Sequence, residues 1–368
     1  MKNLLYGNGV TIQFGGKNYF NDRIIKRAIN NINIKKFPSE IYPKEIKLWV
    51  QLLCDQVPLI ISGEYDLYTN TNDMKASLED FKERYKNRKM PLKVHEIGLE
   101  DYFLINFLLC HKEKIINPEK FNYTQTLRCF FIDSIYNQGK IQLIYKNFPV
   151  EFIEFLKLFD NIFTTNYDWN IEKVTNKEVN YLHGCFHVLD SVYDPNSLRN
   201  KMADSPIKNN PPLPEFTHLY SNALTSYSGG NKKFILESNI NANIAVEKFV
   251  KGMKEKPELR KQIEEWKVSG DKILENMYDS IMLKEKDETL RFGENVSLKN
   301  MDNIEGAITI LGLSPYNDTH IFEQINNNIK LTTIEYYYFS EHEAETVKGL
   351  FNKKEIVLKD VKEFWKEF

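Results

Sequence analysis

The last part of the chain alternates between two kinds of periodicity, and this alternation limits the possible folds more than any other feature. Strand-like runs at residues 307–314, 332–339 and 355–358 are separated by segments of helical spacing at 319–327 and 341–351. Strands that alternate with helices at this spacing form βαβ units, whose strands are parallel. The sequence therefore predicts an α/β fold with a Rossmann-like, doubly wound parallel sheet.

The other strands of this sheet are far apart in the sequence. Residues 3–10 form a short apolar run that stops in a glycine turn, and the β-branched and aromatic run 160–168 ends in polar residues. A third, very short run at 180–184 ends in glycine. These strands and the C-terminal alternation predict one Rossmann-like core, made of residues 1–21, 160–187 and 300–368.

Two long segments interrupt the predicted core. Residues 22–159 carry apolar side chains at three- and four-residue spacing, which predicts a large helical insertion. Residues 188–299 begin with many Pro, Asn, Ser and Gly residues, which predict a long loop, and continue with a helical pattern that breaks at Pro257. Because long loops near nucleotide sites often act as lids, the segment Pro206–Pro214 is a candidate gate.

The composition argues against several classes of function. The 49 Lys and Arg residues are balanced by 51 Asp and Glu residues, so the chain lacks the basic excess that neutralises nucleic-acid phosphates. No segment approaches the ~18 consecutive apolar residues that cross a bilayer, and the first residues break on glycine before a secretory signal can form. We therefore expect a cytoplasmic protein without direct nucleic-acid or membrane binding.

The four cysteines are Cys54, Cys110, Cys129 and Cys185. They are too sparse for a disulfide framework, and no C-x-x-C pair is present to begin a zinc site. Free cysteines are among the most buried residue types, so we expect reduced thiols in the core. The sequence predicts no metal site.

Glycines and polar side chains follow the predicted strands, where a doubly wound sheet binds its ligands. In the turn from Gly7 to Val10, two glycines allow the backbone to approach a pyrophosphate. The spacing is not the full G-x-G-x-x-G pattern, so a plain strand-to-helix turn is an alternative. Late in the chain Gly312, Ser314 and Asp318 place a glycine, a hydroxyl and an acid at another strand end. A strand, a turn and a helix cap explain them equally well.

The second and third strands end in residues suited to catalysis. Asn166 and Asp168 lie two positions apart, so both can face one cleft if the chain stays extended. Asp168 can instead cap the helix that follows. His183 stands at a strand tip beside Gly184, where an imidazole can act as a general base near neutral pH or fill a structural role.

Together these segments resemble the sirtuin superfamily, in particular its bacterial antiphage-defence branch. The resemblance lies in a G-x-G turn at 4–10, a T-x-N-x-D segment at 163–168, a His-Gly pair at 182–184 and a G-x-S turn at 311–318, which follow the family's order. It implies a Rossmann-like domain that binds NAD and breaks the bond between nicotinamide and ribose. The cysteines cannot form the zinc module of the superfamily's deacetylases, so we do not expect removal of acyl groups from lysine.

The resemblance also implies roles for individual residues. Asn166 would position the attacking water and the ribose hydroxyls, His183 would act as the general base, and Asp168 would hold the carboxamide of nicotinamide. The remaining implied contacts to the dinucleotide are Gly7, Asn8, Gly9, Val10, Thr165, Gly312, Ser314 and Asp318.

We therefore expect an NAD+ hydrolase that uses NAD as its substrate and acts as the effector of an antiphage, abortive-infection system. The resemblance implies a homo-oligomer and a partner such as a HerA-type ATPase or another phage-sensing subunit. The main alternative is a subunit that binds NAD or an ADP-ribose derivative without cleaving it. A Rossmann oxidoreductase is disfavoured, because the full glycine pattern and a ribose-binding acid are missing.

Overall fold

In the computed structural model the chain divides into two compact units. Unit 1 consists of Met1–Cys185, Ala223–Lys232 and Val296–Phe368, and unit 2 of Phe186–Asn222 and Lys233–Asn295. The structure describes residues 1–34, 45–69, 71–116, 119–205, 213–223, 230–316 and 318–368.

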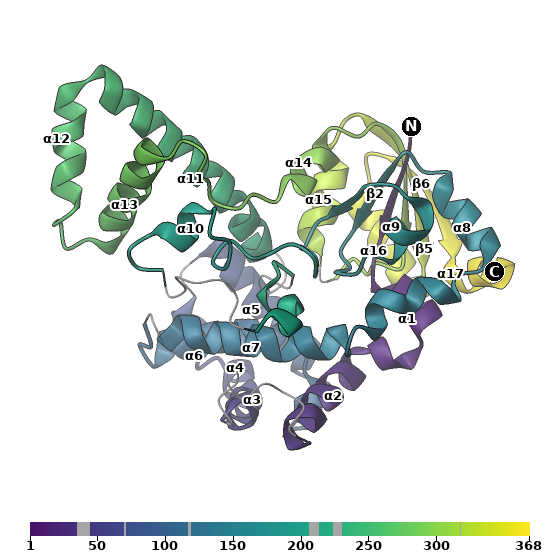
Figure 1. Cartoon of the computed structure of the whole chain (residues 1–368). Helices are drawn as coiled ribbons and strands as arrows, with labels where there is room; N and C mark the ends of the chain where they lie inside the picture. The colour runs from purple at the N-terminus through teal and green to yellow at the C-terminus, as the bar shows by residue number, and fades with distance from the viewer. Residues whose placement is uncertain (35–44, 70, 117–118, 206–212, 224–229, 317) are drawn as a thin grey trace. The chain divides into compact units, whose positions relative to one another are not determined.

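Unit 1 is built around a six-stranded, all-parallel sheet (Figure 1). Its strands are β1 (Lys2–Tyr6), β2 (Asn161–Thr164), β3 (Val179–Tyr181), β4 (Gly306–Leu311), β5 (Leu331–Tyr338) and β6 (Glu355–Asp360). In space they follow the order β3-β2-β1-β4-β5-β6, and every neighbouring pair is parallel. This is the strand order of a doubly wound Rossmann sheet, so the predicted fold class is confirmed.

The two central strands are buried on both faces. Leu4 and Leu5 of β1 and Ile308 and Ile310 of β4 have no exposed surface. Since successive residues of a strand point to opposite faces, the adjacent pair Leu4 and Leu5 shows that both faces are covered. Apolar residues in consecutive positions were therefore a reliable sign of a central parallel strand.

The predicted elements differ from the observed ones mainly at their ends. The helices expected at 319–327 and 341–351 are α15 (Thr319–Asn327) and α16 (Glu341–Leu350). The strand expected at 160–168 is shorter, because β2 stops at Thr164. The Thr164 hydroxyl accepts a hydrogen bond from the backbone N–H of Asn166 at 2.9 Å, which turns the chain away from the sheet.

The insertion between β1 and β2 is helical, as expected, and belongs to unit 1. Its main helices are α2 (Asn21–Asn33), α3 (Ile46–Asp55), α4 (Val57–Ile61), α5 (Asn72–Tyr85), α6 (Asp101–Lys112), α7 (Glu119–Tyr136) and α8 (Val150–Lys157). The indole of Trp49 stacks on Tyr123 with ring centroids 4.1 Å apart, and its N–H donates to Asn106 Oδ1 at 3.0 Å. All four cysteines are buried and form no disulfide, which confirms the predicted core thiols.

Unit 2 has its own small apolar core. Its helices are α10 (Leu198–Lys201), α11 (Gly230–Glu255), α12 (Pro257–Trp266) and α13 (Lys272–Lys286), and α11 begins in the last residues that belong to unit 1. Val246, Val250, Ile263 and Ile281 are buried in its centre. Pro257 begins α12, as the predicted break required. The candidate gate Pro206–Pro214 lies outside the described residues except at its end.

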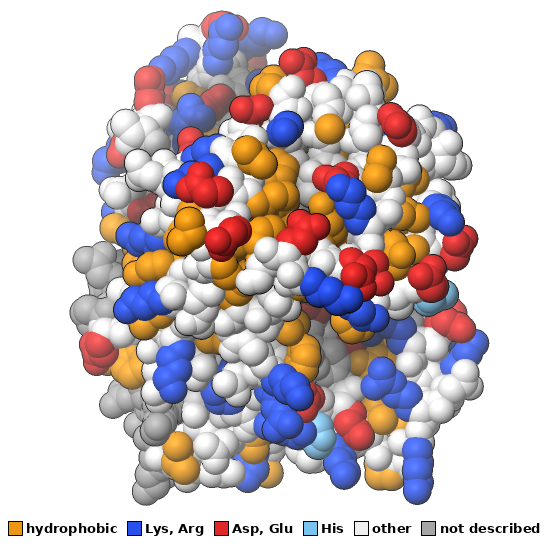
Figure 2. All heavy atoms as spheres, turned by 90° about the vertical axis from the view of Figure 1, so that its right-hand side faces the viewer, with side chains coloured by type: hydrophobic (Ala, Val, Ile, Leu, Met, Phe, Trp, Pro, Cys, Tyr) orange, Lys and Arg blue, Asp and Glu red, His pale blue; other side chains and the backbone are white. Residues whose placement is uncertain are grey.

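The surface of unit 1 over α8, α17 (Val361–Phe364) and the C-terminus carries charges of both signs (Figure 2). Lys and Arg side chains alternate there with Asp and Glu, and hydrophobic side chains lie between them. Val150 and Leu158, at the two ends of α8, are 69% and 58% exposed. In the part of the chain that the structure describes, no helix is both long and apolar enough to cross a membrane.

Candidate functional site

A cavity of about 1360 Å³ lies in unit 1 at the carboxyl ends of the strands. The strand order reverses between β1 and β4, because the chain fills one side of the sheet with β2 and β3 before it returns to form β4, β5 and β6. In doubly wound sheets this switch point leaves a crevice that binds ligands. The residues that follow β1, β2, β3 and β4 all contribute to the lining of this cavity.

The turns after β1 and β4 touch each other through their backbones. Gly7 N donates to Leu311 O at 3.0 Å, and Gly9 N donates to Gly312 O at 2.8 Å. A Cβ atom on Gly9 would lie 2.5 Å from the Cα of Gly312, and Gly312 has a φ of +66°. Only glycine fits at these two positions, since a side chain would push the turns apart and the φ of Gly312 is unfavourable for other residues.

This contact places the start of helix α1 (Asn8–Gly15) at the cavity wall. Asn8 and Gly9 line the cavity, whereas Gly7 and Val10 do not. The Asn8 side chain donates to the carbonyl of Tyr19 at 3.2 Å and so holds the segment that follows α1. The glycine turn therefore positions a helix N-terminus, whose partial positive charge favours anionic groups.

Asn166 is held in one orientation by neighbouring polar groups. Its Nδ2 donates to Thr11 Oγ1 at 2.9 Å and to Gly7 O at 3.4 Å. Thr164 fixes the backbone on either side, because its hydroxyl donates to Tyr6 O and accepts from Asn166 N. Among the described residues the Oδ1 of Asn166 accepts no hydrogen bond, so an acceptor is available at the cavity, which Asn166 lines.

Asp168 has two differently placed carboxylate oxygens. Its Oδ1 accepts from the backbone N–H and the side-chain amide of Asn170, where helix α9 (Asn170–Thr175) begins. Its Oδ2 is buried and has no hydrogen-bond partner within the described ranges. Burial raises the pKa of Asp168 to about 6. Asp168 lines the cavity, as one sequence interpretation expected. It is not the N-cap of α9, which is Trp169, although its carboxylate binds the first residue of that helix.

His183 lies two residues after the end of β3 and lines the same cavity. It is 3% exposed, and its Nε2 lies 3.5 Å from Oδ1 of Asp318. Leu182 N donates to Thr164 O, which extends the contact between β3 and β2 up to this point, and Gly184 then turns the chain with a φ of +78°. The short strand and its terminal glycine thus fix the imidazole beside the end of β2.

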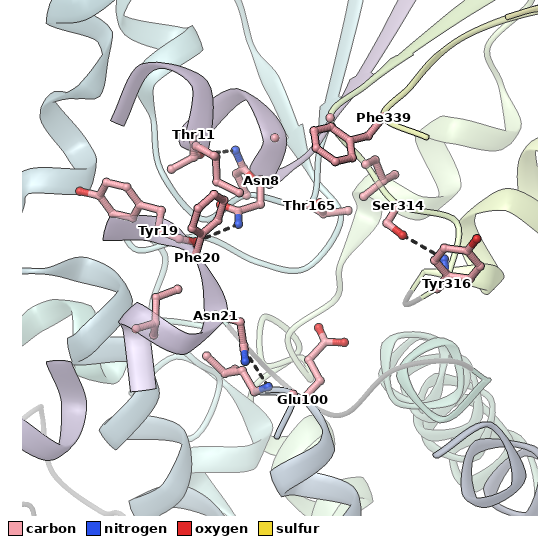
Figure 3. Close-up of a pocket in the computed structure, with 18 of the residues that line it drawn as sticks. Asn8, Thr11, Tyr19, Phe20, Asn21, Glu100, Thr165, Ser314, Tyr316 and Phe339 are labelled. Carbon is pink, nitrogen blue, oxygen red and sulfur yellow. Dashed lines mark hydrogen bonds between the residues drawn. The ribbon is translucent and has the colours of Figure 1, made fainter. Parts of the chain in front are cut away.

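The opposite wall comes from the turn after β4. Figure 3 shows Asn8 and Thr11 on one side of the pocket and Ser314 and Tyr316 on the other. Ser314 Oγ accepts from Tyr316 N at 3.4 Å. Asp318 precedes α15, and its carbonyl accepts from the backbone N–H groups of Ile321 and Phe322 in the first turn of that helix.

Most of the predicted site residues meet in this one cavity. Those that line it are Asn8, Gly9, Thr165, Asn166, Asp168, His183, Gly312, Ser314 and Asp318. The exceptions, Gly7 and Val10, lie just behind the wall. Positions from three distant parts of the sequence are therefore neighbours in space.

Some residues of the site depend on tertiary contacts and could not be predicted from the sequence. Thr11, which orients Asn166, is one helical residue among many, and only the fold shows its partner. The helical insertion also contributes a wall around Glu100 and Asp101, whose carboxylate binds Arg84 through two contacts of 2.7 Å. No local motif marks these residues as part of a site.

No family model, no curated protein and no solved structure matches this chain.

Proposed function

We propose that this protein is an NAD+ hydrolase that cleaves the bond between nicotinamide and ribose and releases nicotinamide and ADP-ribose. One observation carries the proposal: Asn166 and His183 line a single cavity together with Gly9 and Gly312, at the switch point of a doubly wound sheet. Dinucleotides bind at this point in Rossmann folds. The resemblance of the same segments to sirtuins supports the choice of reaction.

The volume and the wall of the cavity suit a dinucleotide. At about 1360 Å³ the cavity exceeds the ~300–1,000 Å³ of most small-molecule pockets. The pyrophosphate would bind at the start of α1, which has no acidic residue in its first turn. Because the amides of Gly7 and Gly9 already bond to the β4 turn, the Asn8 N–H and the helix dipole are the groups left for an anion.

The chemistry requires few protein groups. Nicotinamide leaves a cationic glycoside as a neutral molecule, so no acid has to protonate it, and the enzyme mainly orients the ribose and stabilises an oxocarbenium-like centre. Water attacks C1′ of the ribose while the electron pair of the C–N bond leaves with nicotinamide. Asn166 Oδ1 would accept a hydrogen bond from this water or a ribose hydroxyl, and His183 would take the proton. Asp168 Oδ2 would accept the carboxamide N–H of nicotinamide.

The resemblance to the antiphage-defence branch supports a proposed biological role for this reaction. An enzyme that empties a cell of NAD suits abortive infection, as the resemblance to the defence branch implies. Such an enzyme has to be restrained, and we propose that a homo-oligomer and a partner, such as a HerA-type ATPase or another phage-sensing subunit, provide this control.

The test is nicotinamide release from NAD by the full chain, alone and with candidate partners. We expect Asn166→Ala and His183→Ala each to lower the rate by about a hundredfold or more. Asn303→Ala and His342→Ala serve as matched controls, since both side chains are exposed and neither lines the cavity. Equal release by the wild type and both cavity variants would contradict the assignment.

Binding without turnover would favour the alternative, a non-catalytic subunit. In that case NAD raises the unfolding temperature of the wild type in a saturable way, and no nicotinamide appears under any activating condition. The two functions are thus separated by one thermal scan and one product assay.

A further inference from the structure

Two imidazoles and one carboxylate meet at the wall of the cavity. They belong to His183, Asp318 and His320, which are 3%, 8% and 2% exposed. One ligand atom from each lies within 4.8 Å of the others. The rings of His183 and His320 are inclined by only 25°, with centroids 5.6 Å apart. These side chains come from the loop after β3 and from the start of α15, so the fold alone brings them together.

This set of donors matches the requirements of a transition-metal ion. Imidazole nitrogens and a carboxylate oxygen bind Zn²⁺ at about 2.0–2.2 Å, which separates two ligand atoms on a tetrahedral ion by roughly 3.4 Å. The distance of 3.5 Å between His183 Nε2 and Asp318 Oδ1 already has this value. The ligand atom of His320 lies within 4.8 Å of the other two, so it needs to move by at most about 1.4 Å, which a side-chain rotation of His320 provides.

We propose that His183, Asp318 and His320 bind one divalent transition-metal ion, for which zinc is the best probe. His183 and Asp318 line the cavity, whereas His320 does not. A molecule in the cavity can therefore supply the fourth ligand. Three protein ligands and one open position are the pattern of an accessible zinc site rather than of a closed structural one. The sequence predicted no metal site, because that prediction rested on the four cysteines. The two histidines are far apart in the sequence and only the fold brings them together.

Metal binding at this place has a consequence that rests on the proposed function. Zinc on Nε2 of His183 occupies the lone pair with which the imidazole would accept a proton from water. Zinc is therefore expected to inhibit NAD hydrolysis, and a chelator is expected to restore it. The binding itself does not depend on the reaction.

The experiment is a calorimetric titration of the full, chelator-treated chain with zinc chloride, together with elemental analysis of the zinc content. We expect one zinc ion per chain and no saturable binding of Mg²⁺, which prefers oxygen ligands. His320→Ala and Asp318→Asn should each weaken zinc binding by about tenfold or more. His320→Gln, which keeps most of the buried volume, replaces His320→Ala if that variant does not fold. The control His342→Ala removes an exposed histidine and should leave the affinity unchanged.

The outcomes separate this proposal from the proposed function. The metal site is overturned if the wild type binds no zinc. It is also overturned if the wild type, the His320 variant and Asp318→Asn bind zinc with the same affinity, even if NAD is hydrolysed. Stoichiometric zinc binding that both substitutions weaken supports the site even if no nicotinamide is ever released. If the wild type hydrolyses NAD, the same metal-site variants should also lose inhibition by zinc, measured relative to their own zinc-free rates.

Discussion

The two sides of the cavity are specified in different ways. Around Gly9 and Gly312 the wall consists of backbone, and its shape depends on the close contact between two turns; we call it the glycine wall. Around Asn166, Asp168 and His183 the wall consists of buried polar side chains, and we call it the polar wall. The first wall needs the absence of side chains, whereas the second needs particular ones.

Because of this difference, substitutions in the two walls should have different effects. A change in the glycine wall alters the spacing of β1 and β4, and with it the core of the sheet. A change in the polar wall removes a donor or an acceptor and leaves the strands in place. We therefore expect substitutions in the glycine wall to act on folding and binding together, and substitutions in the polar wall to act mainly on local stability or turnover.

The largest effect on stability is expected from Gly9→Ala. Its Cβ would lie 2.5 Å from Gly312 Cα, and this neighbour is backbone that cannot rotate away. We expect the free energy of unfolding to fall by about 3 kcal/mol or more and NAD binding to be lost. Urea denaturation and the thermal shift with NAD measure both effects.

The matched control for this prediction is Gly349→Ala. Gly349 lies in α16, and a Cβ there would meet no atom within 4 Å. Alanine should stabilise this helix by about 0.5–1 kcal/mol, because glycine is the poorer helix former. If Gly9→Ala were tolerated as well as Gly349→Ala, the close contact of the two turns would not be needed for the fold.

The glycine wall was more accessible to prediction from sequence than the polar one. Gly9 and Gly312 follow apolar runs at short range, so local patterns indicate both turns. His320 and Thr11 carry no such signal, because each gains its significance from a partner more than 130 positions away. The periodicity of the sequence was enough to predict the sheet and its helices. The side-chain contacts across the cavity could be identified only in the folded structure.

The next effect concerns Asp168. Burial of its carboxyl group raises the pKa of Asp168 to about 6. Between pH 4 and 6 the folded chain holds a proton that the unfolded chain has lost, so unfolding releases it and stability falls as the pH rises. Above pH 6 the buried carboxylate is ionised, and the full cost of burying its charge is present. Asp168→Asn removes this cost and keeps an oxygen for Asn170.

We therefore expect Asp168→Asn to stabilise the protein in a pH-dependent way. The difference in the free energy of unfolding should be near zero below pH 4 and reach about 2–3 kcal/mol in favour of the variant above pH 7. Denaturation curves at several pH values measure it, with Asp55→Asn as the control, because Asp55 is exposed and asparagine keeps the oxygen that accepts from Gln51. A difference that stays constant with pH would show that Asp168 titrates normally.

The smallest effect is expected from Thr11→Val, which tests whether orientation of the amide matters on the polar wall. Valine keeps the shape of the side chain but removes the hydroxyl that accepts from Asn166 Nδ2. Without it the amide can rotate, and we expect kcat for NAD hydrolysis to fall by about tenfold, which corresponds to one hydrogen bond of about 1–1.5 kcal/mol. Thr11→Ser retains the acceptor and should restore most of the rate, whereas a purely structural role would affect the unfolding temperature without this rescue of kcat. If valine and serine gave the same turnover as threonine, the orientation of Asn166 would have to come from the backbone turn at Thr164 alone.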